Sequence, residues 1–344
     1  MINNKLLSKK YIVAGPCAAE SEEQVLLTAK SLSACGIRNF RAGVWKPRTK
    51  PGGFEGVGEE GLRWLQKVKE VTGMYVATEI ATPEHAQMAL HYGIDILWLG
   101  ARTVSNPFSV QEIADSLCGK INNLKIMVKN PTSPDLELWI GAIQRLQNSG
   151  IQQITAIHRG FATADNPNYR NTPHWNIPIE LKRRLPHIPL LCDPSHIAGV
   201  AEYVPTIAQQ ALDLNFDGLL VEVHNSPNDA LSDGFQQLTP TVFVDMLDNL
   251  VLRDKDSSAD FLMQMRRQID EIDENLFALL SQRMKIAKNI GIFKNENKIS
   301  VLQTERFAQI EQKFILQAEK LGLTKHFIKN ILENIHTEAL ENQI

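Results

Sequence analysis

The stretch DGLLVEVH at residues 217–224 is the last of eight short β-rich runs that decide the fold. It is apolar throughout its middle, as expected for a parallel strand covered on both faces, and its polar residues Glu222 and His224 come at the end. The earlier runs are YIVAGPCA (11–18), RNFRAGVW (38–45), MYVATEI (74–80), IDILWLGA (94–101), LKIMVKNP (124–131), IQQITAIHRG (151–160) and IPLLCDPSH (188–196).

Helical patterns such as EEQVLLTAKSLSACG (22–36) and PEHAQMALHYG (83–93) separate most of these runs. Eight strand–helix units in about 250 residues predict an α/β fold, a closed (β/α)8 TIM barrel. A doubly wound open sheet is the alternative. Such a sheet usually carries a glycine-rich fingerprint after its first strand, and GPCAAE at 15–20 is not one.

A polar side chain stands at the end of every run. In a barrel these strand ends converge on one mouth, where active sites lie. A buried carboxylate without a partner is costly, so Glu222 is better explained as a mouth residue than as a defect in a strand. The residues at these ends are Cys17, Lys46, Glu79, Arg102, Lys129, Arg159, His196 and Glu222.

Four of the polar residues form a candidate metal site: Cys17, His196, Glu222 and Asp233. They lie at the ends of the first, seventh and eighth predicted strands, or in the loop just after, and these strands are neighbours in a closed barrel. A lone cysteine or histidine is more often a core or turn residue. Four donors together, both soft and hard, favour a divalent transition ion (Mn, Co, Fe or Zn) over Mg²⁺ or Ca²⁺.

The basic residues near the predicted mouth indicate an anionic substrate. A surface arginine or lysine is normally only solvated, but a converging ring of them needs anions, and arginine suits bidentate binding of phosphate or carboxylate. The pattern predicts two or more anionic groups beside the metal. These bases are Arg41, Lys46, Arg48, Arg102, Lys129 and Arg159.

The pattern changes after residue 252. Residues 253–258 are polar and are interpreted as a linker between a barrel at 1–252 and an all-helical domain at 259–344. Three helices are predicted there, at about 261–294, 304–322 and 324–343. A helix as long as the first cannot bury its apolar stripe alone, so it needs a helical partner.

The long helix carries a coiled-coil seam with Arg283 inside it. Apolar residues alternate steps of three and four at Leu262, Met265, Ile269, Ile272, Leu276 and Leu279, and resume at Ile286, Ile290 and Phe293. Position 283 is either a snorkelling arginine or a cation that receives an anion in a helical core. Lys294, eleven residues on, returns to nearly the same face.

Bulk composition excludes several classes of protein. The net charge of −3 gives no reason to expect nucleic acid or an acidic membrane surface as a partner. No apolar run approaches the ~18 residues of a spanning helix, and MINNKLLSKK shows no signal-peptide core. The four cysteines are far apart and without a CxxC pair, which favours free thiols and a cytoplasmic location.

The motifs GPCAAE, RAGVWKPRT, ATE, GAR, VK, HRG, DPSH and VEVH…LSDG resemble, in order, those of the metal-dependent DAHP synthase and KDO8P synthase barrels. The resemblance implies condensation of phosphoenolpyruvate with erythrose 4-phosphate, and metal ligation by Cys17, His196, Glu222 and Asp233. Phosphoenolpyruvate would be held by Arg41, Lys46, Arg102, Lys129 and Arg159, and Glu79 would assist the attacking water. KPRT, which includes Arg48 and Thr49, resembles the erythrose 4-phosphate segment. A KDO8P synthase-like barrel using arabinose 5-phosphate remains the alternative.

Residues 259 to 344 resemble the all-helical chorismate mutases. The resemblance implies that Arg266, Arg283, Lys294, Arg306 and Gln343 bind chorismate, with Arg283 and Lys294 at the reacting groups. Arg266 and Lys294 would be roughly 42 Å apart on one straight helix, so a shared site requires a homodimer. Three positions depart from the family pattern: Gln303, Phe307 and Ala339. They favour the other interpretation of the tail, a dimerising ligand sensor without turnover. Either version implies feedback on the barrel.

Overall fold

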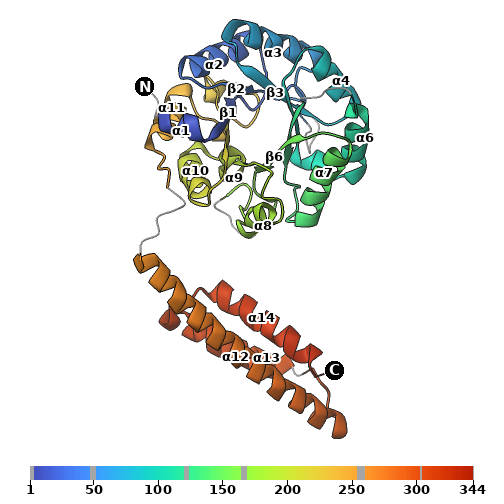
Figure 1. The fold of residues 1–344 in the computed structure, drawn as a ribbon, viewed down its shortest axis with the longest axis vertical. Helices are drawn as coiled ribbons and strands as arrows, with labels where there is room; N and C mark the ends of the chain where they lie inside the picture. The colour runs from blue at the N-terminus through green and yellow to red at the C-terminus, as the bar shows by residue number, and fades with distance from the viewer. Residues whose placement is uncertain are drawn as a thin grey trace. The chain divides into compact units, whose positions relative to one another are not determined.

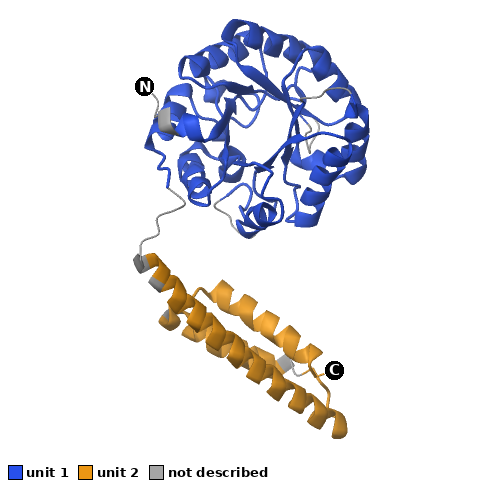
Figure 2. Ribbon diagram, viewed as in Figure 1, with its two compact units in different colours: residues 1–255 blue, residues 256–344 orange. Residues whose placement is uncertain are grey.

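The computed structural model describes residues 4–46, 52–119, 124–163, 169–253, 260–302 and 304–343. The chain forms two compact units, residues 1–255 and 256–344 (Figures 1 and 2). The division falls inside the predicted linker at 253–258, most of which lies outside the described residues.

The first unit is a closed barrel of parallel strands in sequential order, β1 to β8 (Figure 1). The predicted TIM barrel is therefore confirmed, and each of the eight apolar runs contains one strand. The strands are β1 (Tyr11–Gly15), β2 (Asn39–Arg41), β3 (Tyr75–Ile80), β4 (Ile96–Leu99), β5 (Lys125–Lys129), β6 (Gln153–His158), β7 (Leu190–Cys192) and β8 (Gly218–Glu222).

Helices surround the barrel, and several begin at a residue that caps them. The hydroxyls of Ser21 and Thr82 and the carboxylate of Asp135 accept hydrogen bonds from the first turn of α2, α4 and α7. The helices of this unit are α1 (Asn4–Lys9), α2 (Glu22–Ala34), α3 (Glu59–Thr72), α4 (Pro83–His91), α5 (Ala101–Val104), α6 (Pro107–Leu117), α7 (Leu136–Asn148), α8 (Asn176–Arg184), α9 (Pro194–Ala198), α10 (Val204–Asp213) and α11 (Pro240–Asn249). The short helices α1, α5 and α9 were not predicted from the sequence.

Successive side chains of each strand point alternately into and out of the barrel, and this divides the buried residues into two cores. Outward-facing residues such as Phe40 and Val128 pack against the helices in one large cluster. Inward-facing residues fill the middle of the barrel: Val13, Ala77, Ile96, Trp98, Met127, Ile157, Leu191 and Leu220. The interior is therefore packed, and the polar strand residues lie above and below this apolar layer.

The second unit consists of α12 (Asp260–Glu296), α13 (Thr304–Ala318) and α14 (Lys325–Glu341). The three predicted helices are confirmed, and α14 packs against both α12 and α13. Gly322, in the left-handed conformation, lies in the turn before α14, where Thr324 caps its first turn. Among the described residues, no helix of either unit has the length and apolarity needed to cross a bilayer.

Candidate active site

The closure of the barrel brings Cys17 to the end of β8. Strands β1 and β8 pair with Gly15 opposite Glu222, and the Val223 N–H donates to the Gly15 carbonyl at 2.8 Å. Cys17 follows two residues after β1. Gly15 has a positive φ of 150°, and a Cβ there would lie 2.1 Å from the Arg41 carbonyl oxygen. A side chain at residue 15 would therefore disrupt the approach of β1 to β2 beside the site.

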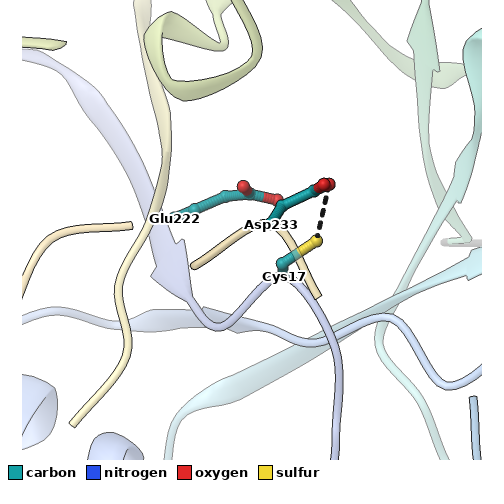
Figure 3. A group of neighbouring side chains, drawn as sticks. All are labelled: Cys17, Glu222 and Asp233. Carbon is teal, nitrogen blue, oxygen red and sulfur yellow. Dashed lines mark hydrogen bonds between the residues drawn. The ribbon is translucent and has the colours of Figure 1, made fainter. Parts of the chain in front are cut away.

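Three of the four predicted metal ligands converge. One donor atom from each of Cys17, Glu222 and Asp233 lies within 4.8 Å of the others (Figure 3). The Cys17 thiol donates to Asp233 Oδ2 at 3.4 Å and lies 3.2 Å from Ser232 Oγ. Lys46 Nζ approaches the same sulfur to 3.0 Å. A soft donor and two hard donors thus meet at one largely buried point, a set that suits a transition ion.

The Glu222 carboxylate is fully buried, and one of its oxygens lacks a hydrogen bond. Its Oε1 lies 3.2 Å from Arg41 Nη1, while Oε2 accepts a hydrogen bond from Gln236 Nε2 at 2.5 Å. Burial opposes ionisation, but His196 and Arg41 lower the pKa of Glu222 below its usual value. The residue is thus an anion whose Oε1 is ion-paired with Arg41 but accepts no hydrogen bond.

His196, the fourth predicted ligand, lies beside this group rather than in it. Its Nδ1 lies 3.7 Å from Glu222 Oε1 and 2.9 Å from Asp193 Oδ2. Asp193 is fully buried and also receives Lys129 Nζ at 2.9 Å on the same oxygen. Burial alone would raise the pKa of the Asp193 carboxyl, but His196 and Lys129 hold it well below its usual range.

Cys17 is held as a thiol by its surroundings. Burial raises its pKa to about 12, and the Glu222 carboxylate adds to the effect. Lys46 and Arg41 oppose the shift without cancelling it. Because metal ligation needs the thiolate, an ion entering this site must displace the Cys17 proton.

The loop after β8 places Asp233. Asp233 adopts the left-handed conformation at φ 52°, which aspartate tolerates better than most residues. Arg170 Nη1 lies 3.1 Å from Asp233 Oδ1 and donates to Gln236 Oε1 at 2.6 Å. Gln237 Oε1 accepts a hydrogen bond from the Cys17 N–H at 2.9 Å. Gln236 and Gln237 therefore fix the loop against Glu222 and Cys17 through their hydrogen bonds.

Two of the predicted cations, Arg41 and Lys129, lie over the Trp98 indole, and a third, Lys46, lies on Cys17. Arg41 is 1% exposed, and its guanidinium lies 4.8 Å from the Trp98 ring centre. Lys129 Nζ lies 6.0 Å from the same ring. Lys46 Nζ and Arg41 Nη2 donate to the Cys17 carbonyl at 3.2 and 3.0 Å. These bases are therefore preorganised beside the predicted metal ligands and not dispersed in solvent.

Arg159 and Arg102 follow β6 and β4 as predicted. Arg159 Nη1 donates to Asn171 Oδ1 at 2.6 Å, and its N–H donates to Asn130 Oδ1 at 2.7 Å. Burial lowers the pKa of Arg159 to about 10, with Arg102 among the charges that contribute, so it stays charged at neutral pH. Arg102 is exposed on α5. The predicted sugar-phosphate residues Arg48 and Thr49 lie outside the described residues.

Glu79 and His224 each contact specific neighbouring side chains or backbone groups. Glu79 Oε2 accepts a hydrogen bond from Trp98 Nε1 at 3.0 Å. A Cβ at residue 100 would lie 2.0 Å from Glu79 Oε1, so Gly100 makes room for this carboxylate. His224 accepts the Ser226 N–H on Nδ1 at 2.9 Å, and its Nε2 lies 3.6 Å from Glu20 Oε2. These contacts give His224 a structural role at the turn.

In the helical unit, two predicted site residues touch. Lys294 is 7% exposed, and its Nζ donates to Gln343 Oε1 at 3.1 Å and to the Val301 carbonyl at 2.7 Å. A Cβ at residue 291 would lie 2.7 Å from the Gln343 Cα, so Gly291 permits this approach. Arg283, by contrast, is exposed.

The other predicted residues of this unit stay apart. Arg266 and Arg306 are exposed on α12 and α13. Phe307 stacks on His336 with ring centres 4.1 Å apart, Ala339 is 5% exposed, and Gln303 lies outside the described residues. Within one chain the structure therefore assembles only part of the predicted cationic site.

Sequence patterns did not reveal the residues that orient the site: Asp193, Trp98, Gln236, Gln237, Ser232 and Arg170. One signal was available. Asp193 directly follows an apolar strand, so the cost of burying a carboxylate applies to it as it does to Glu222.

Two families match the chain. The DAHP synthetase I family matches residues 8–256, and the chorismate mutase type II family matches residues 265–344. A phospho-2-dehydro-3-deoxyheptonate aldolase from Thermotoga maritima is 34% identical over 239 residues, which cover 70% of this chain and 68% of that protein. A 2-dehydro-3-deoxyphosphooctonate aldolase from Acidithiobacillus ferrooxidans is 28% identical over 244 residues, covering 65% and 82%.

Solved structures agree with the sequence matches. The crystal structure of the Thermotoga maritima phospho-2-dehydro-3-deoxyheptonate aldolase (DAHP synthase) superposes with a TM-score of 0.62 at 31% identity, covering 70% of this chain and 68% of that one. A truncated 3-deoxy-D-arabino-heptulosonate 7-phosphate synthase from the same organism gives a TM-score of 0.59 at 27% identity, covering 76% and 87%.

Proposed function

Because this chain belongs to the DAHP synthetase I family over residues 8–256 and matches the chorismate mutase type II family over residues 265–344, we propose that it is a bifunctional enzyme. The barrel condenses phosphoenolpyruvate with erythrose 4-phosphate and water, giving DAHP and phosphate. The helical unit rearranges chorismate to prephenate. The observation that supports the barrel reaction best is the meeting of Cys17, Glu222 and Asp233 beneath a group of buried bases.

The proposed cofactor is a divalent transition ion, and the residues fit one. A buried thiol and two carboxylates lie within 4.8 Å, and Glu222 Oε1 has no hydrogen-bond partner among the described residues. His196 is the proposed fourth ligand. Its Nδ1 beside Asp193 leaves Nε2 for the ion, an arrangement common among metal-binding histidines. When bound, the ion supplies Lewis acidity at the aldehyde oxygen of the sugar phosphate.

The basic residues supply binding and orientation. Lys129, Arg159 and Arg102 are proposed to hold the phosphate and carboxylate of phosphoenolpyruvate. Lys46 and Arg41, already fixed on the Cys17 carbonyl, keep positive charge beside the reacting carbons. Fixed cations screen the repulsion between two phosphorylated substrates and cost no reorganisation during the reaction. Glu79 is the proposed base near the attacking water, and Arg48 with Thr49 the proposed erythrose 4-phosphate contacts.

The alternative substrate is arabinose 5-phosphate. Relatives named 2-dehydro-3-deoxyphosphooctonate aldolase are 25–28% identical to this chain, below the 34% of the heptonate aldolase. Phosphate release measured with phosphoenolpyruvate and each aldose phosphate in turn tests the choice. A higher kcat/KM with arabinose 5-phosphate would overturn the proposed function of the barrel.

We propose that the helical unit acts as a homodimer. Its seam residues on α12 are mostly exposed: Ile272 is 65% exposed, Leu279 62% and Ile286 61%. A coiled-coil seam of this length requires a partner, and a second copy supplies the same seam in a twofold dimer. The second copy also supplies Arg266, which cannot reach Lys294 along its own helix.

A non-catalytic ligand sensor remains the alternative for the tail, because Phe307 and Ala339 replace the polar residues common in the mutase family. A mutase converts chorismate and a sensor does not, so measuring the loss of chorismate absorbance distinguishes these two functions.

We also propose that prephenate or chorismate inhibits the barrel through this unit. Removing residues 259–344 should abolish that inhibition, and unchanged inhibition would mean that the sensor lies elsewhere.

The four cysteines are all free, which supports the proposed cytoplasmic location.

A further inference from the structure

The inner face of α14 carries a histidine, His336, that the proposed mutase site does not yet use. This helix packs against α12 and α13, and the residues of its packed face are buried or half-buried. Most of them are apolar: Ile328, Leu332, Ile335, Ala339 and Leu340. His336 lies in the same row and is half-buried. A polar side chain in such a row costs free energy unless it has a hydrogen-bond partner.

His336 lies between the levels of two cations of α12. Arg283 Nη1 lies 3.5 Å from the Ile335 carbonyl oxygen, and Lys294 Nζ donates to Gln343 Oε1 at 3.1 Å. Residues 335 and 343 are roughly 12 Å apart along α14, so His336 falls within this interval, next to the Arg283 end. Seven residues make nearly two full helical turns, so His336 and Gln343 share one face of the helix.

The imidazole of His336 is oriented by Phe307 of α13. The two rings stack with their centres 4.1 Å apart and their planes inclined by 24°. Stacking fixes the plane of the imidazole and leaves its nitrogens on the free edge. Neither nitrogen forms a hydrogen bond or an ion pair within the part of the chain that the structure describes. An oriented hydrogen-bonding edge therefore stands unused between two cations.

The side chains around this edge offer no other polar contact of their own. Ala339 lies one turn further along α14, is 5% exposed and ends in a methyl group. Phe307 presents only its ring. Chorismate and prephenate are dianions that also carry a hydroxyl group on the ring. The cations suit the carboxylates, but a hydroxyl needs a partner that can accept and donate, and an imidazole can do both.

We propose, on the basis of the mutase function proposed above, that His336 binds the ring hydroxyl of chorismate and determines specificity for it. Phe307 is a positioning residue, since it holds the imidazole by stacking and makes no hydrogen bond. Arg283 and Lys294 attract the two negative charges. His336 thus supplies, from the adjacent turn of α14, the polar contact that Phe307 and Ala339 do not make.

A cycle of protein and substrate changes in the full-length protein tests the proposal. The substrates are chorismate and its analogue with hydrogen in place of the ring hydroxyl. The ratio of their mutase kcat/KM values measures the preference for the hydroxyl, and comparing this ratio between proteins removes the intrinsic reactivity of each substrate. His336→Phe keeps the stacking ring and loses both nitrogens. It should lower kcat/KM for chorismate about tenfold and leave the analogue nearly unchanged, so the ratio should fall about tenfold.

Three further variants separate recognition from folding. His326→Phe makes the same change at an exposed histidine of the same helix and should keep the original ratio. His336→Gln keeps a donor and an acceptor and should recover part of the preference. Phe307→Leu removes the stacking and should lower the ratio while His336 is retained. Circular dichroism shows whether each helical unit is folded. If His336→Phe is not, Phe307→Leu gives the same comparison with the imidazole in place.

Binding of prephenate distinguishes failure of this proposal from failure of the mutase function. Prephenate carries the same hydroxyl and needs no turnover, so titration calorimetry measures its affinity even for a non-catalytic tail. His336→Phe should weaken that affinity about tenfold, and His326→Phe should not. If the original protein does not convert chorismate but His336→Phe weakens prephenate binding, only the mutase function is wrong. An unchanged hydroxyl preference, or an unchanged affinity for prephenate, in folded His336→Phe would overturn the role of His336.

Discussion

Lys129 Nζ and His196 Nδ1 both lie 2.9 Å from one oxygen, Oδ2 of the fully buried Asp193. The proposed phosphoenolpyruvate lysine and the proposed metal histidine are therefore positioned by a single carboxylate. The Asp193 Oδ1 atom accepts the His196 N–H at 3.1 Å, which ties the start of α9 to the same group. A change at Asp193 must affect both halves of the site.

Asp193→Asn should therefore reduce kcat/KM for condensation by about 10–100-fold, the usual cost of removing a carboxylate behind a metal histidine. The asparagine keeps the shape but loses the charge that fixes the lysine and the imidazole. Two measurements separate positioning from general damage: the KM for phosphoenolpyruvate should rise, and the affinity for the ion should fall.

Asp95→Asn is the matched control. Asp95 also pairs with a lysine, Lys69, and accepts a backbone N–H from Val76, but it takes no part in the proposed site. The Asp95→Asn protein should lose some stability but keep its KM for phosphoenolpyruvate and its affinity for the ion. If Asp193→Asn changes only stability, as Asp95→Asn does, the positioning role is wrong.

Metal removal should abolish condensation, and Mn²⁺, Co²⁺ or a similar ion should restore it. Because Cys17 is a thiol with a pKa of about 12, binding should release its proton, so metal affinity should increase as the pH rises. Titration calorimetry in buffers of different ionisation enthalpy counts the released proton. Cys17→Ser should weaken binding and reduce the proton count. Full activity in thoroughly chelated protein would show that the ion is not needed.

His158 should make the barrel sensitive to acid. It is fully buried among Trp139, Phe161, Trp175 and Phe216, and burial lowers its pKa to about 3. The unfolded chain takes up this proton near pH 6.5 and the folded chain does not. The contribution of neutral His158 to the free energy of unfolding is thus complete above about pH 6.5. It is lost as the pH falls towards 3, by up to about 1.4 kcal/mol per pH unit.

His158→Leu should flatten this dependence, since leucine binds no proton. Urea unfolding at several pH values measures it, and all five tryptophans lie in the barrel, so their fluorescence reports this unit alone. His187→Leu, at an exposed histidine, should leave the slope as in the original chain. Equal slopes of the unfolding free energy against pH in all three proteins would mean that His158 takes up its proton in the folded protein as it does in the unfolded chain.

The sequence predicted the eight strands and most of the mouth residues for a simple reason. Strands buried on both faces are continuously apolar, so any polar residue at their ends is conspicuous, as Glu222 and Lys129 are. Gln236 and Trp98 could not be predicted in this way, because their roles arise from contacts made only when distant loops and strands meet. Arg170 illustrates the limit: it is an ordinary surface-type residue until the fold places it on Asp233.

Gly291→Ala should impair the mutase and leave condensation unchanged. The added Cβ would lie 2.7 Å from the Gln343 Cα, so the end of the chain must move and the bond from Lys294 to Gln343 must break. We expect a loss of about tenfold or more in mutase kcat/KM. Gly141→Ala is the control, because a Cβ in that helix meets nothing within 4 Å. Unimpaired mutase activity would mean that the contact with Gln343 does not position Lys294.

Subunit mixing should show that Arg266 and Arg283 act from different chains. They are seventeen residues apart on α12, roughly 25 Å along the axis, and Arg266 to Lys294 is roughly 42 Å. One small dianion cannot reach all three on a straight helix, so a second chain must contribute. Arg266→Ala and Arg283→Ala should each be inactive as mutases. A mixed dimer then has one doubly damaged site and one intact site, so random exchange should restore roughly a quarter of the original activity.

The reverse mixture provides the control. A chain with both substitutions, exchanged with the original chain, damages both sites of every mixed dimer. Mutase activity should therefore fall during exchange from roughly half to roughly a quarter. Residues that act within one chain would give different results, because each original subunit would keep its own site: the first mixture would stay inactive and the second would stay at half. The two time courses thus assign Arg266 to the partner's site or to its own.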